Sequence, residues 1–215
     1  VGDLQDGTVS AIEEMEEIHS FFKSKNVSVS TFYHPKTNWK DIVRASKDAS
    51  FFLYRGHGMS WPDGKYGGLD LNDAISSEAI INDLKLKTNA IVIFQSVCGG
   101  AGSSASDDAD IGIQKAITRV SDYSRPFLSV GASAYYADNF GDGCLNFLND
   151  FFNGKTMKEC FENSIGWSAK LEIDQNYKYD RSKSVGVASS SWGGTVTHTS
   201  YINGVKSVRE VPSFK

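Results

Sequence analysis

The feature that most constrains the fold is a pair of short apolar blocks that each run into a glycine-containing turn. Residues 50–54 form the first block, and the sequence RGHG follows it directly. Residues 90–97 form the second block, which ends in the sequence CGG. Short, nearly continuous apolar runs bounded by turn residues are typical of strands that are buried on both faces. The two blocks therefore predict two strands inside a sheet that helices cover on both sides.

Helix-like and strand-like segments alternate around these blocks. Amphipathic spacing predicts one helix that opens at Ser10, a second that is capped by Asn38, and a third over residues 77–84. Residues 27–32 alternate apolar and polar side chains, which predicts a further strand. Strands that alternate with helices imply a mostly parallel sheet with helices on both faces. We therefore expect an α/β fold with three layers.

The second half of the chain continues this alternation. Residues 111–120 predict a helix and residues 127–130 predict a strand. Two helices follow, one carrying Cys144 on its apolar stripe and one opening at a capping box formed by Thr156 and Glu159.

The tail of the chain has a β-like pattern, with Asn203-Gly204 as a hairpin turn. We expect one domain over residues 1–183 and a β-hairpin extension over residues 184–215 that packs on the same domain. Doubly wound domains normally open with a strand, whereas this sequence opens with a loop and a helix. We therefore expect Val1-Gly2 to be the end of a first strand that lies upstream, in a larger polypeptide.

Composition excludes several classes of function. The net charge is −4 and the basic residues are scattered singly, which argues against a nucleic-acid partner. No apolar run approaches the roughly 18 residues of a membrane span. The three cysteines have no CxxC spacing, which fits neither a disulfide framework nor a zinc knuckle.

His57 and Cys98 are the residues with the clearest chemical potential. Each follows a predicted strand, and a single helix is predicted between those strands. In parallel sheets, functional groups gather at the carboxyl ends of the strands, so one crossover brings both residues to the same edge. There an imidazole can accept the thiol proton and return it to a leaving amine. The backbone amides of Gly58 and Cys98 are candidate donors to an oxyanion, and no metal or organic cofactor is required.

These motifs resemble those of the clan CD cysteine peptidases, which include caspases, gingipains, clostripain and CHAT-domain peptidases. The sequence FFLY precedes His57-Gly58, and AIVIF precedes QSVCGG. The later segments VGAS, ADNF and FFNGKT are closest in pattern to the gingipain and CHAT branch. The resemblance covers roughly residues 16–171.

The resemblance implies a caspase-like fold, a protein or peptide substrate, and a thioester acyl-enzyme. It implies that His57 is the general base, that Cys98 is the nucleophile, and that the amides of Gly58 and Cys98 form the oxyanion hole. It also tilts the expectation toward a secreted or cell-surface protein. Caspases have Gln-Ala-Cys-Arg-Gly where this chain has Gln-Ser-Val-Cys-Gly, so a caspase preference for Asp at the cleavage site is not implied.

Other interpretations remain open beside this one. The chain is alternatively a catalytically inactive interaction or signalling domain on the same fold, or an unrelated α/β binding domain with a pocket at the same edge. Cys144 and Cys160 lie on apolar stripes and are interpreted as core thiols. A zinc site built from His57, Cys98 and Cys144 lacks further ligands.

Two loops carry further hypotheses. Residues 101–110 form either a plain loop, in which Ser106 or Asp107 caps the next helix, or an activation loop that the enzyme cuts itself. A preference for basic residues at the cleavage site requires a carboxylate at the pocket floor. Asp70, Asp138 and Asp142 are the candidates, each expected in a loop.

Overall fold

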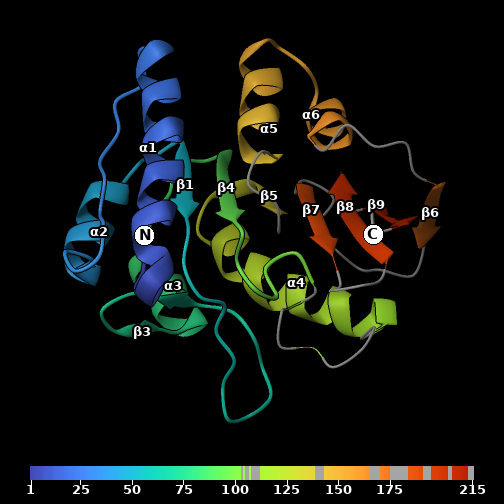
Figure 1. Cartoon of the computed structure of the whole chain (residues 1–215), viewed down its shortest axis with the longest axis horizontal. Helices are drawn as coiled ribbons and strands as arrows, with labels where there is room; N and C mark the ends of the chain where they lie inside the picture. The colour runs from blue at the N-terminus through green and yellow to red at the C-terminus, as the bar shows by residue number, and fades with distance from the viewer. Residues whose placement is uncertain are drawn as a thin grey trace.

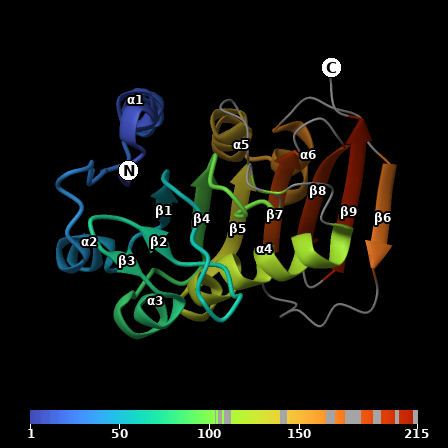
Figure 2. The same ribbon diagram turned by 60° about the horizontal axis from the view of Figure 1, so that its bottom comes forward.

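The computed structural model is a mixed α/β sandwich. It describes residues 1–102, 104, 107, 112–138, 143–164, 170–174, 184–190, 195–202 and 205–212. A seven-stranded sheet has the order β1-β4-β5-β7-β8-β9-β6, and helices cover both of its faces (Figures 1 and 2).

The sheet has a parallel part and an antiparallel part. The parallel strands are β1 (Phe51–Tyr54), β4 (Ala90–Gln95), β5 (Ala132–Asp138) and β7 (Ser184–Ser190). The antiparallel strands are β8 (Thr195–Ile202), β9 (Val205–Pro212) and β6 (Lys170–Asp174). A separate two-stranded sheet pairs β2 (Leu69–Asp70) with β3 (Ala74–Ile75).

Helices pack on both faces of the sheet. A short 3-10 helix η1 (Gln5–Gly7) leads into α1 (Thr8–Ser24), which lies on the same face as α5 (Gly143–Phe152) and α6 (Met157–Asn163) (Figure 2). The opposite face carries α2 (Trp39–Ser46), α3 (Ser77–Asp83) and α4 (Gly112–Ser129). None of the helices in the described part of the chain is long and apolar enough to cross a membrane.

Strand β4 shows why the apolar blocks lie in the interior. All six of its residues are buried. Val92 and Phe94 pack into the core on the α4 side, whereas Ile91 and Ile93 pack into the core on the α1 side. Successive side chains of a strand point to opposite faces, so a strand between two helical layers must be apolar throughout. This arrangement confirms the expected burial of the second block.

The predicted strand at residues 27–32 is absent. This segment is extended, but no backbone hydrogen bond joins it to β1, so it forms no ladder. The alternating pattern was sufficient to make the segment extended, but a strand also needs a paired neighbour. In addition, α1 begins at Thr8 and not at Ser10, whose hydroxyl donates to the carbonyl of Gly7.

The predicted strand at residues 127–130 is also wrong, because α4 continues through Pro126 to Ser129. Tyr123 and Phe127 lie on the same face of this helix, and both rings pack against Phe94 of β4. This buried packing holds the last turn helical despite the proline, which lowers helix stability. The strand forms after Gly131 instead, as β5.

The predictions for α2, α5 and α6 are confirmed. Asn38 caps α2 by accepting a hydrogen bond from the amide of Asp41, and Thr156 and Glu159 form the capping box of α6. In the tail, β8 and β9 pair as neighbours in antiparallel register, while the predicted turn at 203–204 lies outside the described residues.

Candidate functional site

The parallel pairing of β1 with β4 determines where the two glycine-containing turns meet. Phe51 is opposite Ile91, and Tyr54 is opposite Phe94. Both strands therefore end at the same edge of the sheet, and the chain leaves β1 toward His57 just as it leaves β4 toward Cys98. The expectation that one crossover brings these two turns together is confirmed.

Gly58 is in direct contact with the backbone of Cys98. A Cβ atom at position 58 would overlap the carbonyl oxygen of Cys98 and would lie 2.7 Å from its carbonyl carbon. Backbone atoms cannot move aside as the end of a side chain can, so only glycine fits here. The segment His57-Gly58 thus packs directly against the backbone of Cys98.

The hydroxyl group of Tyr123, in α4, stabilises this contact by hydrogen bonding. It accepts a hydrogen bond from the amide of Met59 at 2.6 Å and lies 3.2 Å from the carbonyl oxygen of Cys98. The side chain is fully buried, and burial raises the pKa of its phenol, so the group stays protonated. A single buried hydroxyl therefore joins the loop after β1 to the turn after β4.

Accessible chemical groups remain at this edge. Cys98 and Gly58 are half-buried, and the side chain of His57 is exposed. Among the described residues, the amides of Gly58 and Cys98 donate to no protein acceptor, and the ring of His57 has no hydrogen-bond partner. The edge thus combines a thiol, an imidazole and two free amides.

Buried side chains hold the turn that follows Cys98 by hydrogen bonds to its carbonyl groups. Gly99 has φ +79°, which favours glycine. The hydroxyl of Tyr135 donates to the carbonyl of Gly100 at 3.0 Å, and the guanidinium of Arg119 donates to the carbonyl of Gly102 at 3.1 Å. These two bonds fix the backbone of the turn that follows Cys98.

Arg119 also makes a buried ion pair beneath this turn. Its guanidinium donates to both carboxylate oxygens of Asp107, at 2.6 and 2.7 Å, and both side chains are less than one-tenth exposed. Burial alone would raise the pKa of Asp107, but the hydrogen bonds from Arg119 and from the amide of Ser104 hold it below its usual value. Asp107 therefore stays ionised, and it joins the amide of Ser104 to Arg119 of α4. It does not cap α4, which begins at Gly112.

A second network supports the strand ends. Arg55 donates to the carboxylate of Glu14, in α1, at 3.2 Å and to the carbonyl of Ser96 at 3.0 Å. Ser96 has φ +50°, and its amide donates to Asp138 at 3.2 Å. The chain therefore bends sharply between β4 and Cys98, and both sides of the bend are hydrogen-bonded.

The expected loop carboxylates lie elsewhere than predicted. Asp70 is part of β2, and Asp138 is the last residue of β5 and is completely buried. Neither is a loop residue, and Asp142 lies outside the described residues.

The other two thiols are part of the core. Cys144, in α5, is completely buried, and burial, aided by the charge of Asp138, raises its pKa well above the usual value. Burial raises the pKa of Cys160 to about 11. Thiolates form readily only where the charge is stabilised, so neither residue is suited to nucleophilic attack. Among the described residues, no group of three His, Cys, Asp or Glu side chains is placed to hold a metal ion.

Sequence reasoning missed the groups that hold the two turns together. Tyr123, Arg119 and Arg55 act on partners that are distant in sequence, and each type of side chain is common in ordinary helices and loops. An Arg at the end of an apolar strand was a weak signal for Arg55, because a buried cation needs a carboxylate nearby.

Comparison with protein-family models, curated proteins and solved structures finds no match for this chain. The interpretation of the site therefore depends on its own geometry and chemistry.

Proposed function

We propose that this chain is a cysteine endopeptidase of caspase-like fold, in which Cys98 is the nucleophile and His57 is the general base. The observation that carries the proposal is the backbone contact between Gly58 and Cys98, because it fixes the histidine-bearing turn against the thiol-bearing residue.

The proposed reaction proceeds in two stages. His57 accepts the proton of the Cys98 thiol, and the thiolate attacks the carbonyl carbon of the peptide bond. The C–N bond then breaks, the amine leaves with the proton from His57, and a thioester remains on Cys98. A water molecule that gives a proton to His57 attacks this thioester, the carboxylic acid leaves, and the sulfur regains its proton.

Two further features support this assignment. The amides of Gly58 and Cys98 have no protein acceptor, so they are available to donate to the oxyanion of the tetrahedral intermediate. Of the three thiols, Cys98 alone is not fully buried. Cys98 is therefore the thiol best placed to meet the electrophilic carbon of a substrate, whereas Cys144 and Cys160 are enclosed in the core.

A catalytically inactive interaction domain is the second candidate. The observation that favours it is the exposed ring of His57, which lacks a hydrogen-bond partner among the described residues. A general base is usually held in one orientation by another group. In this case the two turns would form a rigid binding edge without turnover.

A thiol-directed peptide probe tests the proposal. We expect a pool of peptidyl acyloxymethyl ketones to label Cys98, as located by mass spectrometry, and quenched-fluorescent peptides to be hydrolysed. Cys98→Ala should abolish both signals. His57→Ala should slow labelling at neutral pH by about 10²–10⁴-fold, the usual contribution of a general base.

Matched controls separate catalysis from folding. His19→Ala removes an imidazole from α1, and Cys160→Ala removes a core thiol, so neither should slow the labelling of Cys98. Labelling of Cys144 or Cys160 in place of Cys98 would refute the proposal. Equal labelling of Cys98 in wild type and His57→Ala, without peptide hydrolysis, would instead support the inactive domain.

A further inference from the structure

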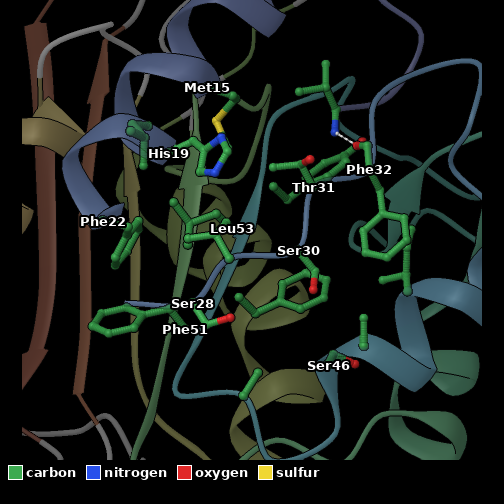
Figure 3. A pocket seen from close by; sticks show the side chains of 18 of the residues that line it. Met15, His19, Phe22, Ser28, Ser30, Thr31, Phe32, Ser46, Phe51 and Leu53 are labelled. Atoms are coloured by element: carbon green, nitrogen blue, oxygen red, sulfur yellow. Dashed lines mark hydrogen bonds between the residues drawn. The ribbon is translucent and has the colours of Figure 1, made fainter. Parts of the chain in front are cut away.

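The outer flank of β1 borders a cavity of about 430 Å3. The cavity lies between β1 and the extended segment of residues 27–33 (Figure 3). Met15 and Phe22 of α1 line one side, and Ile42 and Ala45 of α2 also line it. Because α1 and α2 lie on opposite faces of the sheet, the cavity continues the sheet in its own plane.

Backbone groups that face this cavity lack partners. The amide of Ile91 in β4 donates to the carbonyl of Ser50, so in a parallel ladder the backbone groups of Leu53 and Arg55 face away from β4. Among the described residues, the amides of Leu53 and Arg55 donate to no acceptor, and neither do those of Ser30 and Phe32 across the cavity. Two facing rows of unused donors are what the two neighbours of a missing strand would present.

Val1 and Gly2 already occupy the end of this cavity in the manner of a strand. The nitrogen of Val1 donates to the carbonyl of Phe32 at 2.7 Å, and the carbonyl of Val1 accepts from the amide of His34 at 3.0 Å. On the other side, the amide of Gly2 donates to the carbonyl of Arg55 at 3.0 Å. Consecutive residues thus bond alternately to two neighbours, which is the pattern of a central parallel strand.

We propose that the cavity is a slot for a β-strand, and that its occupant is an extended apolar stretch of polypeptide joined to the nitrogen of Val1. The strand runs parallel to β1 and lies between β1 and residues 27–33. Both of its faces contact helices, so its side chains are apolar throughout. The inference is independent of the proposed peptidase activity.

The chemistry of Val1 favours an occupant that is joined by a peptide bond. The nitrogen of Val1 is buried at a position where an ordinary peptide amide would make the same hydrogen bond. Burial lowers the pKa of its ammonium group to about 6, because the charged form loses hydration there. An amide carries no charge and avoids this cost.

The hydrogen bonds of Val1 and Gly2 also determine the register. The residue joined to Val1 would accept from the amide of Arg55, and the residue before it would accept from the amide of Phe32. The next two residues would accept from Leu53 and Ser30 in turn. An occupant of four residues would therefore cover the four residues of β1.

Stepwise extension of the chain tests the slot. We expect a Val-Ile extension before Val1 to slow amide hydrogen exchange at Arg55 and Phe32 by about tenfold or more, measured by NMR. A Val-Ile-Val-Ile extension should also slow exchange at Leu53 and Ser30. Phe52 and Tyr54 serve as internal references, because their amides face β4 and should change less.

Two controls decide the outcome. Extensions of alternating Gly and Ser have the same length but bury no apolar surface, and equal slowing by them would overturn the proposal, as would no slowing by any extension. Free Val-Ile-Val-Ile peptide added to the unextended chain tests for a separate partner. If it slows Leu53 and Ser30 as strongly as the joined extension does, the occupant is another chain and the proposal is wrong. The shorter extension guards against poor folding of the longer one.

Discussion

The two flanks of β1 differ in how completely the strand is hydrogen-bonded to a neighbour. On the inner flank, β1 pairs with β4 along its whole length, and the turns that follow are locked by Gly58, Tyr123 and Arg55. On the outer flank, residues 27–33 lie across the cavity from β1 without pairing to it. The difference teaches that a strand-like sequence favours an extended backbone. Whether that backbone becomes a paired strand of the sheet depends on the packing and hydrogen bonds that a neighbouring segment offers.

The largest expected effect comes from disturbing the inner flank at Gly58. Gly58→Ala places a methyl group on the backbone of Cys98, so we expect a loss of about 3 kcal/mol in the free energy of unfolding, the upper range for overpacking. Labelling of Cys98 by the peptide probe should fall by about 10²-fold, because displaced catalytic groups lose that much. Urea unfolding and labelling rates measure the two effects.

Gly7→Ala is the matched control for this substitution. A Cβ atom at position 7 meets only the Cβ atom of Leu4, at the ordinary distance of 3.7 Å. We expect a loss of less than about 1 kcal/mol and unchanged labelling. If Gly58→Ala behaves in the same way, the contact that supports the site has no energetic importance.

A smaller effect is expected at the outer flank, from the ammonium group of Val1. Burial lowers its pKa from 8.0 to about 6, so the unfolded chain binds more protons between these values. Stability should therefore rise as the pH rises from about 6 to 8, by roughly 2–3 kcal/mol. Urea unfolding at pH 5.5 and 8.5 measures this change.

Acetylation of Val1 isolates this contribution from those of the other ionisable groups in the chain. The acetylated chain keeps an N–H donor for the carbonyl of Phe32 but carries no charge. Subtracting its pH dependence from that of the free chain should leave the rise described above. A difference near zero would mean that the outer flank already accommodates the charge.

The smallest effect is expected for Tyr123→Phe, which keeps the ring against Phe94 but removes the hydroxyl. The amide of Met59 then loses its partner, and we expect a loss of about 1–2 kcal/mol. Labelling of Cys98 should slow more than in Tyr135→Phe, whose hydroxyl reaches Gly100 and not the contact itself. Equal slowing in both variants would show that Tyr123 acts only through general stability.

The sequence was informative where local pattern and burial agree. The apolar blocks predicted β1 and β4, and their shared edge predicted that His57 and Cys98 lie on neighbouring turns. The sequence was misleading where distant packing decides. Residues 127–130 were predicted to form a strand, yet the packing of Phe127 on Phe94 continues α4 to Ser129.

The hydrogen bonds that hold the two turns together could not be predicted from the sequence, for a related reason. Tyr123 and Met59 are far apart in sequence, as are Arg55 and Glu14, and nothing local marks these residues as partners. Likewise, the alternating pattern at residues 27–32 predicts an extended backbone, but it does not predict which segment pairs with it. Pairing is a property of two segments, so one segment cannot reveal it.

The mixture of parallel and antiparallel pairing has a consequence for the order in which the molecule assembles. The hairpin of β8 and β9 closes over a two-residue connection, whereas β1 must wait for β4, and β4 for β5, across long crossovers that include a helix. Contacts between residues distant in sequence form slowly, because the loop must be closed before the contact stabilises it. We therefore expect the turns that carry Cys98 and His57 to come together only in the last stages of folding. If Cys98 is the nucleophile, as proposed, a nascent or partly folded chain would be inactive, and hydrolysis would begin only when the sheet is complete.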